Sequence, residues 1–123
     1  MRRVLAVAGV ATLLLSACVS ENRPATCDEP AVTVELTLTA DSLAPTDPAV
    51  CRDQEVTLVV DSKVDGTLHI HGYDEQVPAT TVSAGEELRL EFTASRSGQF
   101  PIELHTDAQP QGVSVGVFTV HER

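Results

Sequence analysis

The sequence predicts an all-β protein, an antiparallel β-sandwich of about six to eight strands. Two observations predict this fold class. Apolar and polar residues alternate with period two through most of the chain after residue 30, which is typical of strands with one buried face. No segment in that part of the chain has the 3.6-residue spacing of an amphipathic helix. Short alternating segments separated by turn residues favour a sandwich over a fold that alternates strands with helices.

The clearest predicted strand is residues 31–39, where Val and Leu alternate with Thr and Glu without a break. The same pattern recurs along the chain, and Gly, Pro, Asp and Ser lie between the segments, as expected for turns. The further predicted strands are residues 55–60, 67–71, 80–82, 86–93, 100–105 and 113–121. Their apolar faces supply only a modest core, of the size that a disulfide often supports in a small domain.

Length and charge restrict the class of protein. The chain has 123 residues, enough for one domain, and its 18 acidic and 8 basic residues give a net charge of −10. Nucleic-acid binding is excluded because phosphates require a basic face, and aromatic residues, which would stack on bases, make up only 3% of the chain.

The N-terminus has the features of an export signal. Arg2 and Arg3 precede an uncharged stretch at 4–15, which is too short to span a bilayer but fits a signal peptide. The sequence Leu15-Ser16-Ala17-Cys18 that follows resembles the lipobox of bacterial lipoproteins. The alternative is an ordinary secretory signal with a chance cysteine. Twin-arginine export is disfavoured because the residues that flank such arginine pairs are missing.

This resemblance implies that residues 1–17 are removed and that Cys18 carries the lipid. Acyl chains on this cysteine would anchor the protein to the cell membrane at its extracytoplasmic face. The chain from Cys18 on would carry a charge of −12, because the removed segment holds two basic residues and no acidic ones. Residues 18–30 are predicted to be the tether, and residues 31–123 the folded domain.

The two other cysteines, Cys27 and Cys51, are predicted to form a disulfide, because a cysteine pair outside the cytosol is most simply a bridge. It would contribute about 3 kcal/mol by constraining the unfolded chain. The alternative is a thiolate metal site, but the sequence has no Cys-x-x-Cys spacing.

Catalytic motifs are weak throughout. Residues 112–116 match the Gly-x-Ser-x-Gly pattern, but that motif requires a strand–turn–helix and a downstream acid and histidine. Residues 61–66 resemble a calcium loop, yet Lys63 takes a ligand position and Gly72 stands where the bidentate glutamate belongs. We therefore expect no enzyme activity.

The histidines are the one group of residues whose spacing suggests a functional site, namely a metal site. His69 and His71 are two residues apart on a predicted strand, so their side chains lie on the same face. His105 ends another predicted strand and is the natural third ligand. Neutral imidazoles suit copper or zinc at an exported, oxidising site. The alternative is that the histidines simply face solvent.

Residues 55–120 resemble a bacterial cupredoxin-like domain. The likeness rests on a strand with His-Ile-His-Gly-Tyr-Asp, followed by Phe-Thr-Ala at 92–94, Gly-Gln-Phe at 98–100 and Gly-Val-Phe-Thr-Val at 116–120. It implies a Greek-key sandwich with a metal site at one end. Blue-copper members of that family bind the metal through Cys, His and Met of the loop between the last two strands, together with an upstream His.

This sequence departs from the family's ligand pattern. Aligning the Gly-x-Phe motifs puts Leu104 at the cysteine position, Asp107 near the loop histidine and Ser114 near the methionine, and Met1 is the only methionine. His69 or His71 matches the upstream histidine, whereas His105 matches no family ligand. A metal would therefore be held by histidines, with Asp107 or Asp74 as a further ligand, and not in a blue-copper electron carrier.

The leading hypothesis is a membrane-anchored, cupredoxin-like lipoprotein that binds copper or another divalent metal through His69, His71 and His105. The alternative is a metal-free accessory or scaffold lipoprotein that interacts with another envelope protein.

Overall fold

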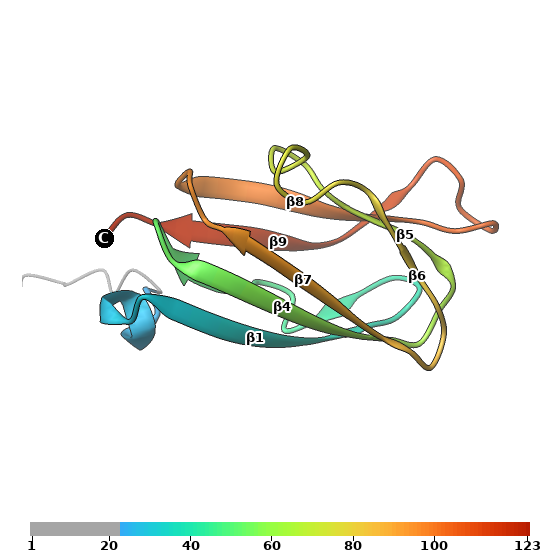
Figure 1. Ribbon diagram of the computed structural model, residues 1–123. Helices are drawn as coiled ribbons and strands as arrows, with labels where there is room; N and C mark the ends of the chain where they lie inside the picture. The colour runs from blue at the N-terminus through green and yellow to red at the C-terminus, as the bar shows by residue number, and fades with distance from the viewer. Residues whose placement is uncertain (1–22) are drawn as a thin grey trace, which may run out of the picture.

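The structure, a computed structural model, describes residues 23–123 and consists of two β-sheets packed face to face (Figure 1). The predicted signal peptide and the predicted lipid-bearing Cys18 lie outside the described residues. A short 3₁₀-helix, η1 (Ala25–Asp28), precedes the strands. The strands are β1 (Ala31–Leu38), β2 (Leu43–Ala44), β3 (Ala49–Cys51), β4 (Glu55–Ser62), β5 (Gly66–Ile70), β6 (Thr80–Val82), β7 (Glu87–Thr93), β8 (Gly98–His105) and β9 (Val113–His121).

The four-stranded sheet has the order β2-β1-β4-β7, and the five-stranded sheet has the order β3-β9-β8-β5-β6. Most neighbouring strands are antiparallel, as predicted, but β1 and β4 are parallel, and so are β3 and β9. The sheets are therefore mixed. The physical reason is a crossover: after β2 the chain passes to the other sheet, forms β3 there and returns to the first sheet as β4.

All seven predicted strands are present within one or two residues of their expected bounds. The structure adds β2 and β3, which the sequence does not reveal. Each has at most three residues, and they lie near Pro45 and Pro48, so neither can display an alternating pattern.

The core lies between the sheets and is made of the apolar residues on the inner face of each strand. In β4 the inner residues Val56, Leu58 and Val60 are almost fully buried, and in β8 the inner residues are Ile102 and Leu104. The aromatic rings form one cluster: Tyr73 packs edge-on against Phe92, Phe100 and Phe118. The outward residues of these strands therefore form the outer surfaces of the sheets.

The N-terminal segment packs on the domain. Cys27 and Cys51 form the predicted disulfide, with their Cα atoms 5.2 Å apart. The side chain of Gln54 donates to the carbonyl oxygens of Thr26 (2.7 Å) and Glu29 (2.9 Å). Residues 25–30, which the sequence assigns to the tether, are thus part of the folded unit, since a buried amide and a disulfide hold them there. Within the described part of the chain no helix has the length and apolar character needed to cross a membrane.

Candidate functional site

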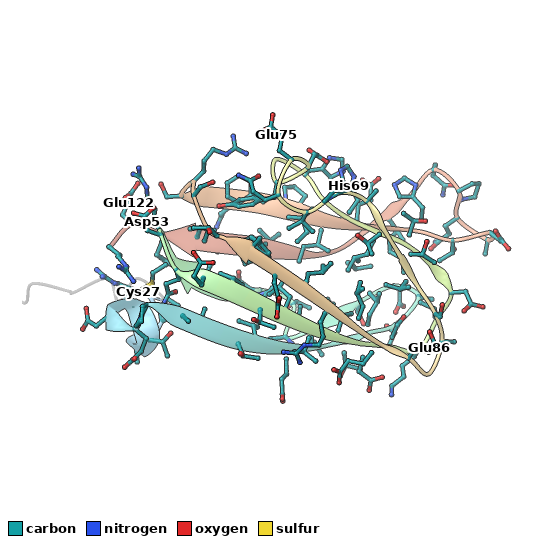
Figure 2. All side chains as sticks on the ribbon, viewed as in Figure 1. Cys27, Asp53, His69, Glu75, Glu86 and Glu122 are labelled. Atoms are coloured by element: carbon teal, nitrogen blue, oxygen red, sulfur yellow. A yellow bond between two sulfur atoms is a disulfide. The ribbon has the colours of Figure 1, made fainter. Side chains whose placement is uncertain are left out.

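The three predicted ligands His69, His71 and His105 lie on the solvent side of the five-stranded sheet. Leu68 and Ile70 of β5 point into the core, so His69 between them points outward. Strand β8 is antiparallel to β5, with His69 opposite Glu103 and Thr67 opposite His105. Figure 2 shows His69 on the outer side of the layer that contains β5 and β8. The register therefore brings histidines that are far apart in the sequence onto one surface.

Glu103 connects His71 and His105. His71 Nε2 lies 3.1 Å from Glu103 Oε2, and His105 Nε2 lies 2.7 Å from Glu103 Oε1. Because carboxylate oxygens are about 2.2 Å apart, these contacts place the two imidazole nitrogens within about 8 Å of each other. Two of the three predicted ligands thus meet at one carboxylate, which the ligand prediction did not include.

His69 has a different partner. Its Nε2 contacts Asp74 Oδ1 in the loop after β5, and Asp74 Oδ2 also accepts the Gly72 backbone N–H at 3.3 Å. The rings of His69 and His71 are neighbours, with centroids 4.3 Å apart and planes tilted by 54°. His69 therefore packs beside the Glu103 cluster, while its own nitrogen is bound to another carboxylate.

The electrostatics of both carboxylates follow from these contacts. The hydrogen bond from His71 lowers the pKa of Glu103, against a smaller opposing effect of desolvation. The hydrogen bond from His69 lowers the pKa of Asp74 in the same way. Both groups are therefore ionised at neutral pH and present negative charge to the imidazoles.

As the side chains stand, residues 23–123 contain no group of three or more His, Cys, Asp or Glu arranged to hold an ion. His71 Nε2 and His105 Nε2 contact different oxygens of the Glu103 carboxylate, each at a hydrogen-bond distance. The prediction that His69, His71 and His105 share one metal stays a prediction.

Asp107, the weaker candidate ligand, lies apart from this cluster. It is exposed in the loop between β8 and β9, and among the described residues no histidine forms an ion pair with it. Together with His105 it lines a cleft of about 740 Å³ between that loop and the turn joining β4 to β5. The loop lies at the end of the sandwich opposite η1 and the C-terminus (Figure 1).

The positions that the resemblance assigns to blue-copper ligands have other roles here. Leu104 is completely buried between the sheets. Ser114 is exposed opposite Glu103, at a β-bulge: Ile102 pairs with Gly116 and Glu103 with Ser114, so that Val115 is the extra residue. Both cysteines within residues 23–123 are joined in the disulfide, so neither supplies a thiolate.

Glu103 is the functional candidate that the sequence analysis missed. A signal was present, because Glu103 and His105 are two residues apart on one predicted strand and so share its outer face. The pairing of His69 with Glu103 was not accessible, because strand register depends on residues far apart in the sequence.

No protein-family profile matches the chain, and no curated protein is significantly similar to it in sequence. Solved structures are similar in fold. A multicopper oxidase from Pseudomonas thermotolerans superimposes with a TM-score of 0.58 at 17% identity, over 76% of this chain and 30% of that one. The laccase of B. aclada is similar over 74% of this chain but only 22% of its own length, with a TM-score of 0.57 and 13% identity. The chain thus spans less than a third of these oxidases.

Two smaller proteins are matched over most of their length. Auracyanin from Roseiflexus castenholzii has a TM-score of 0.55 and 19% identity, over 72% of this chain and 95% of that one. A copper-binding protein solved in its apo form has a TM-score of 0.58 and 14% identity, over 75% and 89% of the two chains. These likenesses, with the two sheets described above, define the fold as a cupredoxin-like β-sandwich. The fold that the sequence resemblance implied is thereby confirmed.

Proposed function

We propose that this protein is an extracytoplasmic membrane lipoprotein whose cupredoxin-like domain binds copper or another divalent metal through surface histidines, without enzyme activity of its own. The observation that carries the proposal is the meeting of His71 and His105 at the Glu103 carboxylate, with the ring of His69 beside them. Several imidazoles next to an ionised carboxylate are the donors that zinc and copper(II) favour.

The proposal excludes blue-copper electron transfer, because the blue-copper ligand set does not fit this chain. That site requires a cysteine thiolate. Leu104, which occupies the corresponding position, is buried in the core, and the two described cysteines are bonded to each other. A histidine and carboxylate site of another type fits the residues that are present.

The likeness to copper proteins adds support. The matched structures include a copper-binding protein, auracyanin and multicopper oxidases, which use the same sandwich. Because the identities of the matched structures to this chain are 13–19%, they support a copper-related role but name no ligand.

The proposed location rests on the sequence. A lipid on Cys18 would hold the chain at the membrane through residues 18–24, and η1 lies at the end of the sandwich opposite the loop between β8 and β9 (Figure 1). The end that bears His105 would then point away from the membrane, toward an envelope partner. Cys18→Ser should release the protein from the membrane fraction. A Cys18→Ser variant that stays with the membranes would contradict the anchor.

Metal titration of the purified protein tests the binding function. Calorimetry with Cu²⁺ and with Zn²⁺ should give a Kd tighter than about 10 μM for at least one ion. The double variant His69→Ala/His71→Ala should weaken binding by about 10-fold or more. His121→Ala is the matched control: it removes the fourth histidine, at the far end of β9, and should leave the affinity unchanged.

A wild-type Kd weaker than about 10 μM for both ions, or an unchanged Kd in the double variant, would refute this function. That outcome would favour the metal-free accessory role, in which the domain serves only as a scaffold for an envelope protein.

A further inference from the structure

The two ring nitrogens of His105 both face hydrogen-bond acceptors. Nδ1 lies 3.0 Å from the carbonyl oxygen of Pro110, and Nε2 lies 2.7 Å from Glu103 Oε1. A neutral imidazole has a single N–H and satisfies only one acceptor. Neither the Pro110 carbonyl nor the ionised Glu103 carboxylate can donate, so a neutral ring leaves one of its two nitrogens with a lone pair that faces an acceptor, where a bound cation would remove the repulsion.

This arrangement is the one in which proteins orient a metal-binding histidine. A backbone carbonyl that accepts from one ring nitrogen fixes the tautomer and directs the lone pair of the other nitrogen toward the ion. Here Pro110, in the loop after β8, supplies the carbonyl, and Nε2 points at the carboxylate.

Gly112 lies against the Glu103 and His105 side chains. Its φ is +83°, and a Cβ added there would lie 2.7 Å from His105 Cε1 and even closer to Glu103 Oε1. The absent side chain thus leaves room for the carboxylate and the imidazole to lie against the backbone. Glu103 and His105 are held in position by the bulged pairing of β8 with β9 on one side and by this close contact on the other.

The contact between His71 and Glu103 has a spacing that suits a metal ion, whereas His105 contacts the other carboxylate oxygen at 2.7 Å. Ligands about 2.0–2.1 Å from a tetrahedral ion lie about 3.3 Å from each other, and His71 Nε2 is 3.1 Å from Glu103 Oε2. His71 follows the end of β5 and its side chain is 45% exposed, and a shared ion requires its ring to turn toward His105. His69 is less well placed, because Asp74 already binds its Nε2.

We propose that the metal centre is built on Glu103, with His71 Nε2, His105 Nε2 and the Glu103 carboxylate as its ligands, and that it selects a divalent ion, Zn²⁺ or Cu²⁺, over Cu⁺. This inference rests on the proposed function and refines it. Imidazole and carboxylate donors suit divalent ions, whereas Cu⁺ is selected by thiolate and thioether ligands. Neither is available among residues 23–123, since both cysteines there are disulfide-bonded and the only methionine is Met1. His69 is a positioning residue that packs on His71.

Calorimetry and EPR on the purified protein test the ligand set. Glu103→Gln keeps the size of the side chain and should weaken Zn²⁺ and Cu²⁺ binding by about 10-fold or more, as should His105→Ala. His69→Phe keeps a ring beside His71 and should change the Kd by less than about 3-fold. Glu91→Gln is the control for net charge, because it removes one negative charge from an exposed position on the opposite sheet. It should leave the Kd unchanged.

Each outcome discriminates. Binding by the wild type with an unchanged Kd and Cu²⁺ EPR spectrum in Glu103→Gln would overturn the Glu103 centre and leave the proposed function standing. A loss in His69→Phe as large as in His105→Ala would also overturn it. Cu⁺ binding as tight as Cu²⁺ binding would refute the selectivity. The absence of any binding would refute the proposed function itself and this inference with it.

Discussion

Gln54 is buried without any exposed surface, and its side-chain amide holds the N-terminal segment onto the sandwich. Its Oε1 accepts the backbone N–H of Cys51 at 2.7 Å. Its Nε2 donates to the carbonyl oxygens of Thr26 at 2.7 Å and Glu29 at 2.9 Å. The substitution Gln54→Ala removes all three hydrogen bonds while leaving the disulfide in place.

The magnitude follows from these contacts. A hydrogen bond inside a protein contributes about 1 kcal/mol net, and a buried donor left without a partner costs about 1–3 kcal/mol. Cys51 is fully buried, so the loss of a partner for its N–H has the larger cost in free energy of unfolding. Thr26 and Glu29 are exposed, and their carbonyl oxygens can accept hydrogen bonds from water instead. We expect Gln54→Ala to lower the free energy of unfolding by about 3 kcal/mol.

Urea unfolding followed by circular dichroism measures this loss as a lower midpoint with an unchanged slope. Gln76→Ala is the matched control, because Gln76 is exposed and makes one side-chain bond, to Ser95 Oγ at 2.9 Å. It should cost less than about 0.5 kcal/mol. If Gln54→Ala cost as little as Gln76→Ala, the buried amide would contribute nothing net, and the reasoning would be refuted.

Two further predictions concern the Glu103 cluster. The pKa of Glu103 is lowered from an ordinary value of 4.5 in the folded protein, so its ionised form stabilises the fold fully above about pH 4.5, and this contribution is lost as the pH falls through the lower folded-state pKa. The difference in urea midpoint between wild type and Glu103→Gln should therefore shrink as the pH falls below about 4.5; a difference that grew over that range would contradict the assigned direction. Gly112→Ala should destabilise the protein by more than Gly85→Ala, because both glycines have positive φ, +83° and +81°, but only Gly112 has side chains where a Cβ would lie. The backbone conformation alone costs about 1 kcal/mol in each variant, and equal losses in thermal unfolding would show that the Glu103 and His105 side chains move aside freely.

The prediction of strands was firmest where a strand buries a single face over five residues or more, although the three-residue β6 was also predicted. In β4 and β7 the alternation is strong enough to fix both the element and its inward side. The strands β2 and β3 were not predictable, because they lie beside Pro45 and Pro48 and show no alternation, so that only their partner strands reveal them.

The sequence predicted that histidines form the candidate site, but it did not predict that Glu103 belongs to it. Same-face placement of His69 and His71 follows from the two-residue period of a strand. The role of Glu103 depends on which strand pairs with β5, on the register of that pair and on the bulge opposite Glu103 in β9. Asp107 looked equivalent to Asp74 in the sequence, yet only Asp74 lies against a histidine.

The sequence by itself determined the all-β class, the inward faces of the long strands, the Cys27–Cys51 pair and the lack of a cysteine at position 104. Each of these follows from local spacing or from residue identity. Only the tertiary structure decided that β1 and β4 are parallel, and that Glu103 lies between His71 and His105. The β1–β4 pairing and the contact between His71 and Glu103 join residues more than 20 positions apart, and they are set by how the whole chain packs its core, which no local pattern encodes.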